Sequence, residues 1–173
     1  MLVRVEVPQD RAAISAVVEA AFGRPDEARL VEALRTSSAW LTGLSLVATD
    51  PGRPRGPVVG HVLCTRGFVG DTPALGLAPL AVVPRRQRSG VGAALIHAVL
   101  GAADALGEPL VALLGDRGYY ARFGFVRSGE LGIDPPDPRW AAHFQVRPLS
   151  AYGLHGGALC GTFRYAPAFD AVG

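Results

Sequence analysis

The chain has 173 residues and a formal net charge of +2, which is too small to indicate nucleic acid binding. Hydrophobic residues make up 49% of the sequence, so an extended disordered chain is excluded. The apolar stretches are all much shorter than a membrane span, and the length suits a single domain over residues 1–173.

The compartment is inferred from the two cysteines and the first residues. Cys64 and Cys160 lie far apart without the spacing of metal ligands, so we expect free, buried thiols in a reducing compartment. Residues 1–8 alternate like a strand and lack the apolar segment of a signal peptide. Both observations favour a cytoplasmic protein without a metal site.

Strand patterns recur along the chain, and two predicted helices lie between the first strand and the second. We expect strands over residues 1–7, 44–48, 58–69, 75–83, 110–114, 144–148 and 158–165. The two helices begin near Asp10 and Asp26, which are predicted to cap them. Their apolar faces are formed by Ile14, Val17, Val18, Ala21 and Phe22, and by Leu30, Val31 and Leu34. Proline-rich segments at 50–57 and 134–138 are predicted loops.

The most informative segment is Val83-Pro84-Arg85-Arg86-Gln87-Arg88-Ser89-Gly90-Val91-Gly92, which leads into an amphipathic helix over residues 90–106. A helix N-terminus carries unpaired backbone N–H groups and the positive end of the helix dipole. Glycine lets a phosphate approach these groups because it has no Cβ. The segment therefore predicts an anion cradle, most simply for a pyrophosphate.

Three phosphate motifs can be compared with this cradle. A P-loop needs a lysine, and the chain has none. The dinucleotide fingerprint needs a third glycine where Leu95 stands. The pattern Gln/Arg-x-x-Gly-x-Gly/Ala is filled by Gln87, Gly90 and Gly92. An ordinary strand-to-helix turn remains the alternative reading.

A second pattern follows the short apolar strand at 110–114. Tyr120 stands four residues before the pair Gly124-Phe125, on a segment predicted to be a short helix before the next strand. The two patterns together, over residues 44–128, resemble the acetyl-CoA-binding region of the GNAT superfamily of N-acetyltransferases. The resemblance implies an α/β (α+β) fold with a mixed, mostly antiparallel, splayed central sheet that has helices on both faces.

The resemblance also implies a function and a set of cofactor contacts. It implies direct transfer of an acetyl group from acetyl-CoA to a primary amine, with coenzyme A as product. The cofactor contacts would come from a bulged strand and from the cradle: Leu80, Ala81, Val82, Gln87, Arg88, Ser89, Gly90, Val91 and Gly92. We expect Gln87 to act more through its main-chain N–H than its side chain, and Ser89 to cap the helix. A plain core strand and a solvated basic turn are the alternatives.

Tyr120 is the candidate general acid for the departing thiolate. A phenol with a pKa of about 10 suits this late proton transfer. Packing beside Phe123 and Phe125 is the alternative role, and Tyr119 is the alternative hydroxyl. Cys64 has no neighbour in sequence that would activate its thiol for a covalent intermediate.

The general base and the acceptor are not fixed by any motif. No carboxylate stands between Thr72 and Asp104. Candidates without an assigned role are Glu27, Glu32, Asp71, His61 and His143, and Trp40 and Trp140 could line an acceptor pocket. A small-molecule amine is the first expectation, a protein N-terminus or lysine the second, and aminoacyl-tRNA a distant third. A non-catalytic acyl-CoA-binding sensor and pairing into a homodimer through edge strands also stay open, and no membrane partner is expected.

Overall fold

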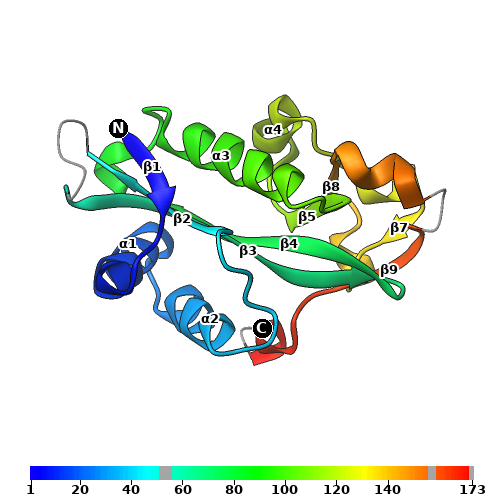
Figure 1. The fold of residues 1–173 in the computed structure, drawn as a ribbon, viewed down its shortest axis with the longest axis horizontal. Coiled ribbons are helices and arrows are strands. Elements are labelled where there is room, and N and C mark those ends of the chain that lie inside the picture. Colours follow the sequence, from blue (N-terminus) through cyan, green and yellow to red (C-terminus); the bar gives the residue numbers. More distant parts are fainter. Residues whose placement is uncertain (51–55, 156–158, 172–173) are drawn as a thin grey trace.

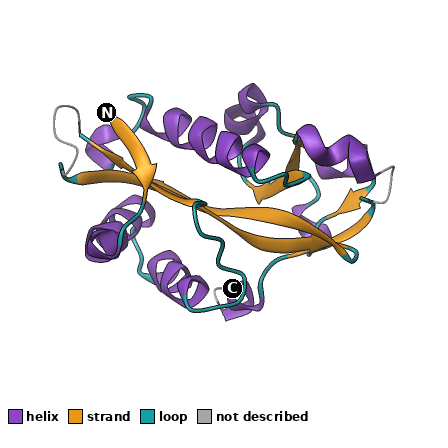
Figure 2. Ribbon diagram, viewed as in Figure 1, coloured by secondary structure: helices purple, strands orange, loops and turns teal. Residues whose placement is uncertain are grey.

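A computed structural model describes residues 1–50, 56–155 and 159–171, and its centre is an open, twisted sheet (Figures 1 and 2). Its strands are β1 (Leu2–Val5), β2 (Ser45–Thr49), β3 (Val58–Val69), β4 (Thr72–Val82), β5 (Leu110–Leu114), β6 (Val126–Arg127), β7 (Ile133–Asp134), β8 (Phe144–Pro148) and β9 (Gly161–Arg164). The main order is β1-β2-β3-β4-β5-β8-β6, and β9 pairs with both β3 and β7.

Most strand pairs in this sheet are antiparallel. Among the described residues, only β4 with β5 and β7 with β9 run parallel, so the predicted mixed sheet is confirmed. The β4–β5 pairing is short, because it consists of Leu75 opposite Val111 and Gly76 opposite Ala112. Beyond Gly76 the two strands are no longer paired, and this is the splay that the resemblance implied.

Helices cover both faces of the sheet, as expected. In Figure 1, α1 (Arg11–Phe22) and α2 (Asp26–Arg35) lie below it, while α3 (Val91–Ala105) and the short α4 (Arg117–Tyr120) lie above. The C-terminal 3₁₀ turn Pro167–Ala171 packs against α2 on the lower face.

The core contacts of α3 explain its position on β3. Val91, Leu95 and Val99 are buried, as expected for the apolar face of the predicted amphipathic helix. A Cβ at Gly60 of β3 would lie 2.9 Å from the side chains of both Leu95 and Val91, so only glycine allows the helix this close. Leu106, the last residue of the helix predicted over 90–106, instead follows the end of α3 and is 57% exposed.

The predicted caps of the first two helices are wrong in detail. Asp10 occupies the N-cap position of α1, but its carboxylate accepts hydrogen bonds from Arg4 and from the N–H of Val7. It therefore joins β1 to the helix instead of closing the helix end. Asp26 is the first residue of α2 and not its cap, which is Pro25.

Other sequence expectations are confirmed only in part. The strand expected over 158–165 is observed only over Gly161–Arg164. Residue 158 and residues 51–55 of the predicted 50–57 turn lie outside the described residues. Cys64 is buried, but Cys160 is exposed, because it precedes the edge strand β9. Within the described ranges, no helix is long and apolar enough to cross a membrane.

A buried polar cluster joins β1, β2, β3 and α2. The Glu6 carboxylate receives two hydrogen bonds of 3.0 Å from the Arg35 guanidinium and one from the Ser45 hydroxyl. The His61 ring lies 2.9 Å from Ser45 Oγ and 3.7 Å from the Glu6 carboxylate. Burial alone would raise the pKa of Glu6, but the contacts with His61, Arg35 and Ser45 outweigh burial and lower the pKa to about 2.

We predict that Glu6→Gln lowers the free energy of unfolding at pH 7 by about 3 kcal/mol, because it leaves the buried Arg35 charge without its main partner. The folded-state pKa lies below the unfolded value, so the wild-type advantage is full above about pH 4.5. It is lost as the pH falls from 4.5 towards 2. Urea denaturation of both proteins between pH 3 and pH 8 measures this difference.

Glu32→Gln is the control for this prediction. Glu32 also pairs with Arg35, but its side chain is 50% exposed, so we expect a change below about 1 kcal/mol. An unfolding difference between wild type and Glu6→Gln that is equal at pH 3 and pH 7 would contradict the assignment.

Candidate functional site

The cradle between β4 and α3 has the geometry of an anion site. Gly90 is the N-cap of α3 with φ 87°, and no side chain caps this helix end. Arg88 has φ 57°, a left-handed conformation found in no other non-glycine residue of the described ranges. The N–H groups of the first helical turn lack carbonyl partners within the helix, so they are available to a bound anion.

Two side chains hold this loop in place. The Gln87 side-chain amide donates to the carbonyl of Val82 at 3.1 Å, and the Gln87 main-chain N–H donates to Pro84 at 3.2 Å. The expectation for Gln87 is therefore reversed, because its N–H is already used and its side chain ties the loop to β4. Ser89 donates to the carbonyl of Arg86 at 2.6 Å and does not cap the helix.

The three arginines of the cradle differ in their surroundings. Arg86 forms an ion pair of 2.9 Å with Asp50. Arg85 and Arg88 are exposed and form no ion pair with any residue that the structure describes. These two guanidinium groups are therefore the ones available to phosphate oxygens.

A pocket of about 340 Å³ opens beside the cradle. It is lined by Ala21, Phe22, Leu80, Val82, Gln87, Arg88, Gly92 and Tyr119. Five of these were predicted from the motif, so the structure brings the bulged strand and the cradle together. Of the other predicted contacts, Ser89 and Gly90 are exposed in the loop beside the pocket, whereas Ala81 and Val91 are buried.

The sequence did not indicate the contribution of α1 to this pocket. Phe22 was assigned to the core face of its helix, but it is 43% exposed and lines the pocket with Ala21. Helical periodicity shows which residues share a face and cannot distinguish a core from a pocket wall. The left-handed Gly23 that ends α1 directly after Phe22 was the available signal.

Strand β4 bulges next to the pocket. Leu77 pairs with Cys64 and Leu80 with Val62, so β4 has one residue more than β3 between these two pairs. On its other side β4 has no partner beyond Gly76. On this side, the backbone of Leu80 and Val82 has no strand partner, and both residues line the pocket.

The two tyrosines of α4 point to different places. A Cβ at Gly92 would lie 2.6 Å from the Tyr119 hydroxyl, so Tyr119 reaches across to the start of α3. Tyr120 packs inward, with its ring edge-to-face against Phe125 at 5.7 Å and over Gly115. Burial, and then the neighbouring Tyr119, raise the pKa of Tyr120 to about 12, so Tyr120 keeps its proton at neutral pH.

None of the five candidate bases lines the cradle pocket. Glu27 pairs with Arg24, Glu32 with Arg35, and Asp71 lies 3.8 Å from Arg164 at an exposed turn. His143 is exposed, and His61 is fully buried beside Ser45, where burial lowers the pKa of its ring. Within the described residues, no group of three or more potential ligands could hold a metal ion.

Cys64 is unsuited to a covalent role. Its side chain is fully buried, and burial, followed by Glu108, raises the pKa of its thiol above the ordinary range. A thiol that stays protonated is a poor nucleophile.

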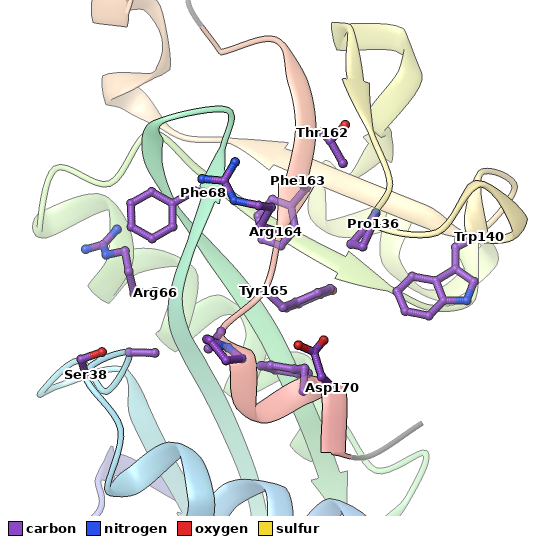
Figure 3. Close-up of a pocket in the computed structure, with 14 residues that line it drawn as sticks. Ser38, Arg66, Phe68, Pro136, Trp140, Thr162, Phe163, Arg164, Tyr165 and Asp170 are labelled. Atoms are coloured by element: carbon purple, nitrogen blue, oxygen red, sulfur yellow. The ribbon is translucent and has the colours of Figure 1, made fainter.

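A larger pocket of about 680 Å³ lies near the C-terminal end of the chain (Figure 3). Trp140 lines it, as the sequence had suggested for an acceptor pocket. Trp40 does not, because its ring packs beside the Arg35 guanidinium at 5.3 Å.

Comparison with known proteins agrees with this geometry. The model of the Acetyltransferase (GNAT) family matches residues 12–125. The uncharacterized N-acetyltransferase YhbS of Escherichia coli K12 is 35% identical over 158 residues, which cover 90% of this chain and 92% of YhbS. The uncharacterized N-acetyltransferase YjhQ of the same strain is 40% identical over 134 residues, 75% of this chain and 72% of YjhQ.

Two solved structures are similar over nearly the whole chain. E. coli YhbS in complex with CoA gives a TM-score of 0.89 at 32% identity and covers 99% of this chain and 93% of its own. A GNAT family acetyltransferase from Brucella melitensis in complex with acetyl-CoA gives a TM-score of 0.74 at 32% identity. The match covers 98% of this chain and 97% of that chain. The cradle, the splayed sheet and these similarities together show that the chain belongs to the GNAT family of N-acetyltransferases.

Proposed function

We propose that the protein transfers an acetyl group from acetyl-CoA directly to the primary amine of a small molecule. The observation that carries this proposal is the uncapped N-terminus of α3, which opens into a pocket walled by the bulged strand β4. Relatives at 32% identity were crystallised with CoA and with acetyl-CoA, which supports the same cofactor here.

The cofactor's pyrophosphate would lie at the start of α3. The N–H groups of Arg88 to Gly92 and the dipole of α3 would bind the phosphate oxygens, and the free guanidinium groups of Arg85 and Arg88 would add charge. The pantetheine arm would run along Leu80, Ala81 and Val82, where β4 has no β5 partner. Phe22 would cover the arm from α1.

The transfer step needs one bond made and one broken. The amine nitrogen attacks the thioester carbonyl, the C–N bond forms, and the C–S bond breaks. An N–H group of the β4 bulge would stabilise the negative charge on the carbonyl oxygen. The nitrogen loses one proton to solvent, and the sulfur gains one, with the Tyr120 hydroxyl as donor to the leaving sulfur.

A cytoplasmic location fits this function, because both cysteines are free thiols, as is usual in a reducing compartment.

We predict that Gly90→Glu weakens acetyl-CoA binding at least 10-fold, because a carboxylate would stand where the pyrophosphate binds. Calorimetric titration with acetyl-CoA measures the affinity, with 3′-dephospho-CoA and NAD as specificity controls. Gly107→Glu is the matched variant, since Gly107 also has a positive φ (73°), is exposed, and has open space around its Cβ at the other end of α3. Equal affinities of the two variants would refute the cradle.

We predict that Tyr120→Phe lowers kcat about 100-fold and leaves the acetyl-CoA affinity within about twofold, because the lost hydroxyl acts only as the thiolate leaves. Release of free thiol in the presence of an amine measures kcat. Tyr119→Phe is the comparison, and we expect it to change the affinity more than kcat, since Tyr119 lines the cradle pocket. Loss of thermal stability and binding together in Tyr120→Phe would favour a packing role instead.

Single-turnover thiol release also tests whether the protein is an enzyme. A non-catalytic acyl-CoA-binding sensor would bind acetyl-CoA and release no thiol with any amine. A protein acetyltransferase would release thiol with peptide amines and not with small ones.

A further inference from the structure

Five of the fourteen residues that line the larger pocket are aromatic, and we refer to it as the aromatic pocket (Figure 3). Its walls come from four parts of the chain that are distant in sequence: Ser38 and Ala39 after α2, the end of β3, the loop that carries Pro136 and Trp140, and the segment 162–170. Its volume of about 680 Å³ lies within the range of sites for small molecules. The cradle pocket shares no lining residue with it.

Two glycines in the sheet allow the aromatic wall to lie directly on the strands. A Cβ at Gly76 of β4 would lie 2.6 Å from the Tyr165 ring, and one at Gly67 of β3 would lie 2.7 Å from the Phe163 ring. Tyr165 in turn packs against Phe163 at 4.8 Å and Phe169 at 4.5 Å between ring centroids. The inner wall is therefore a continuous set of packed rings with little freedom to move.

The aromatic pocket reaches the point where the sheet splays. Tyr165 covers Gly76, which forms the last β4–β5 pair with Ala112 before the strands diverge. Tyr120 lies over Gly115, which directly follows β5, and Tyr120 contributes, after burial and Cys64, to the raised pKa of Tyr165. A molecule in this pocket would thus approach the same opening as the cofactor, from the side of the sheet that carries α2 and the C-terminal turn (Figure 1).

The lining of the pocket carries one carboxylate, that of Asp170. Arg66 is neutralised by Glu108 through two hydrogen bonds of 2.6 Å, and the exposed Arg164 guanidinium lies 3.8 Å from Asp71. The exposed carboxylate of Asp170 forms no ion pair with any residue in the described ranges. It is therefore available to a cationic group of a ligand.

We propose that the aromatic pocket is the acceptor site and that it selects a primary amine carried on an aromatic or similarly sized apolar body. The rings of Trp140, Tyr165 and Phe169 bind the body, and Asp170 attracts the ammonium group as it enters. This inference rests on the proposed acetyl transfer. The ammonium ion first gives one proton to solvent, and the neutral amine then attacks the thioester and loses a second proton in the transfer step above.

The first experiment compares two primary amines that differ in the body. We expect kcat/KM for thiol release from acetyl-CoA to be at least 10-fold higher with 2-phenylethylamine than with ethanolamine. Tryptophan fluorescence gives an independent measure of binding. Saturable quenching by 2-phenylethylamine, lost in Trp140→Phe and absent with ethanolamine, is the expected result.

Two variants test the parts of the pocket separately. Phe169→Ala should raise KM for 2-phenylethylamine at least fivefold and leave KM for ethanolamine unchanged. Asp170→Asn should raise KM for both amines and remove the salt dependence of kcat/KM, which a purely structural role would not affect. Leu106 and Glu130 are exposed and lie outside the pocket lining, so Leu106→Ala and Glu130→Gln should leave KM for both amines and the salt dependence of kcat/KM unchanged.

The outcomes separate this inference from the proposed function. Acetyl-CoA binding without preference for the aromatic amine, or equal effects of Phe169→Ala on both amines, overturns the aromatic pocket as acceptor site and leaves the acetyltransferase intact. Absence of acetyl-CoA binding overturns both. Acetylation of peptide amines in preference to both small amines also overturns the inference.

Discussion

The structure depends on one interruption in its sheet, the end of β4–β5 pairing after Gly76. Parallel neighbours normally use each other's backbone groups along their full length, and here β4 continues to Val82 without its neighbour. The bulge between Leu77 and Leu80 turns the freed groups further from regular pairing. Backbone N–H and C=O groups that lack a strand partner are what an extended ligand such as a pantetheine arm can use, which is why we propose that the arm lies along β4.

Glycines allow other parts of the chain to pack directly against both faces of this interrupted sheet. Gly60 lets α3 approach β3 from one side, while Gly67 and Gly76 let the rings of Phe163 and Tyr165 lie on the other. A larger residue at any of these positions would meet an atom within 3 Å and push a layer outward. The same two strands, β3 and β4, thus carry α3 on one face and the inner wall of the aromatic pocket on the other.

Local patterns predicted much of the fold, and distant contacts explain what they missed. The first and last residues of β3, β5 and β8 lie within a few positions of those that the alternation and the turn residues predicted. The spacing of Gln87, Gly90 and Gly92 likewise located the cradle, because the helix start and its glycines are consecutive in sequence. The position of Phe22, in contrast, depends on how α1 meets β4. The aromatic pocket depends on β9 folding back onto β3, a contact across about a hundred residues that no local pattern encodes.

The environment of Tyr120 limits how it can act on the leaving group. Its pKa of about 12 lies roughly three to four units above that of a typical thiol, so full transfer of its proton to a free thiolate is uphill. A hydrogen bond from the same hydroxyl strengthens as negative charge collects on sulfur, and this effect needs no transfer before the C–S bond breaks. The burial that raises the pKa also limits the access of water to the Tyr120 side chain. We therefore infer that Tyr120 stabilises the developing thiolate first and gives up its proton only as solvent replaces it.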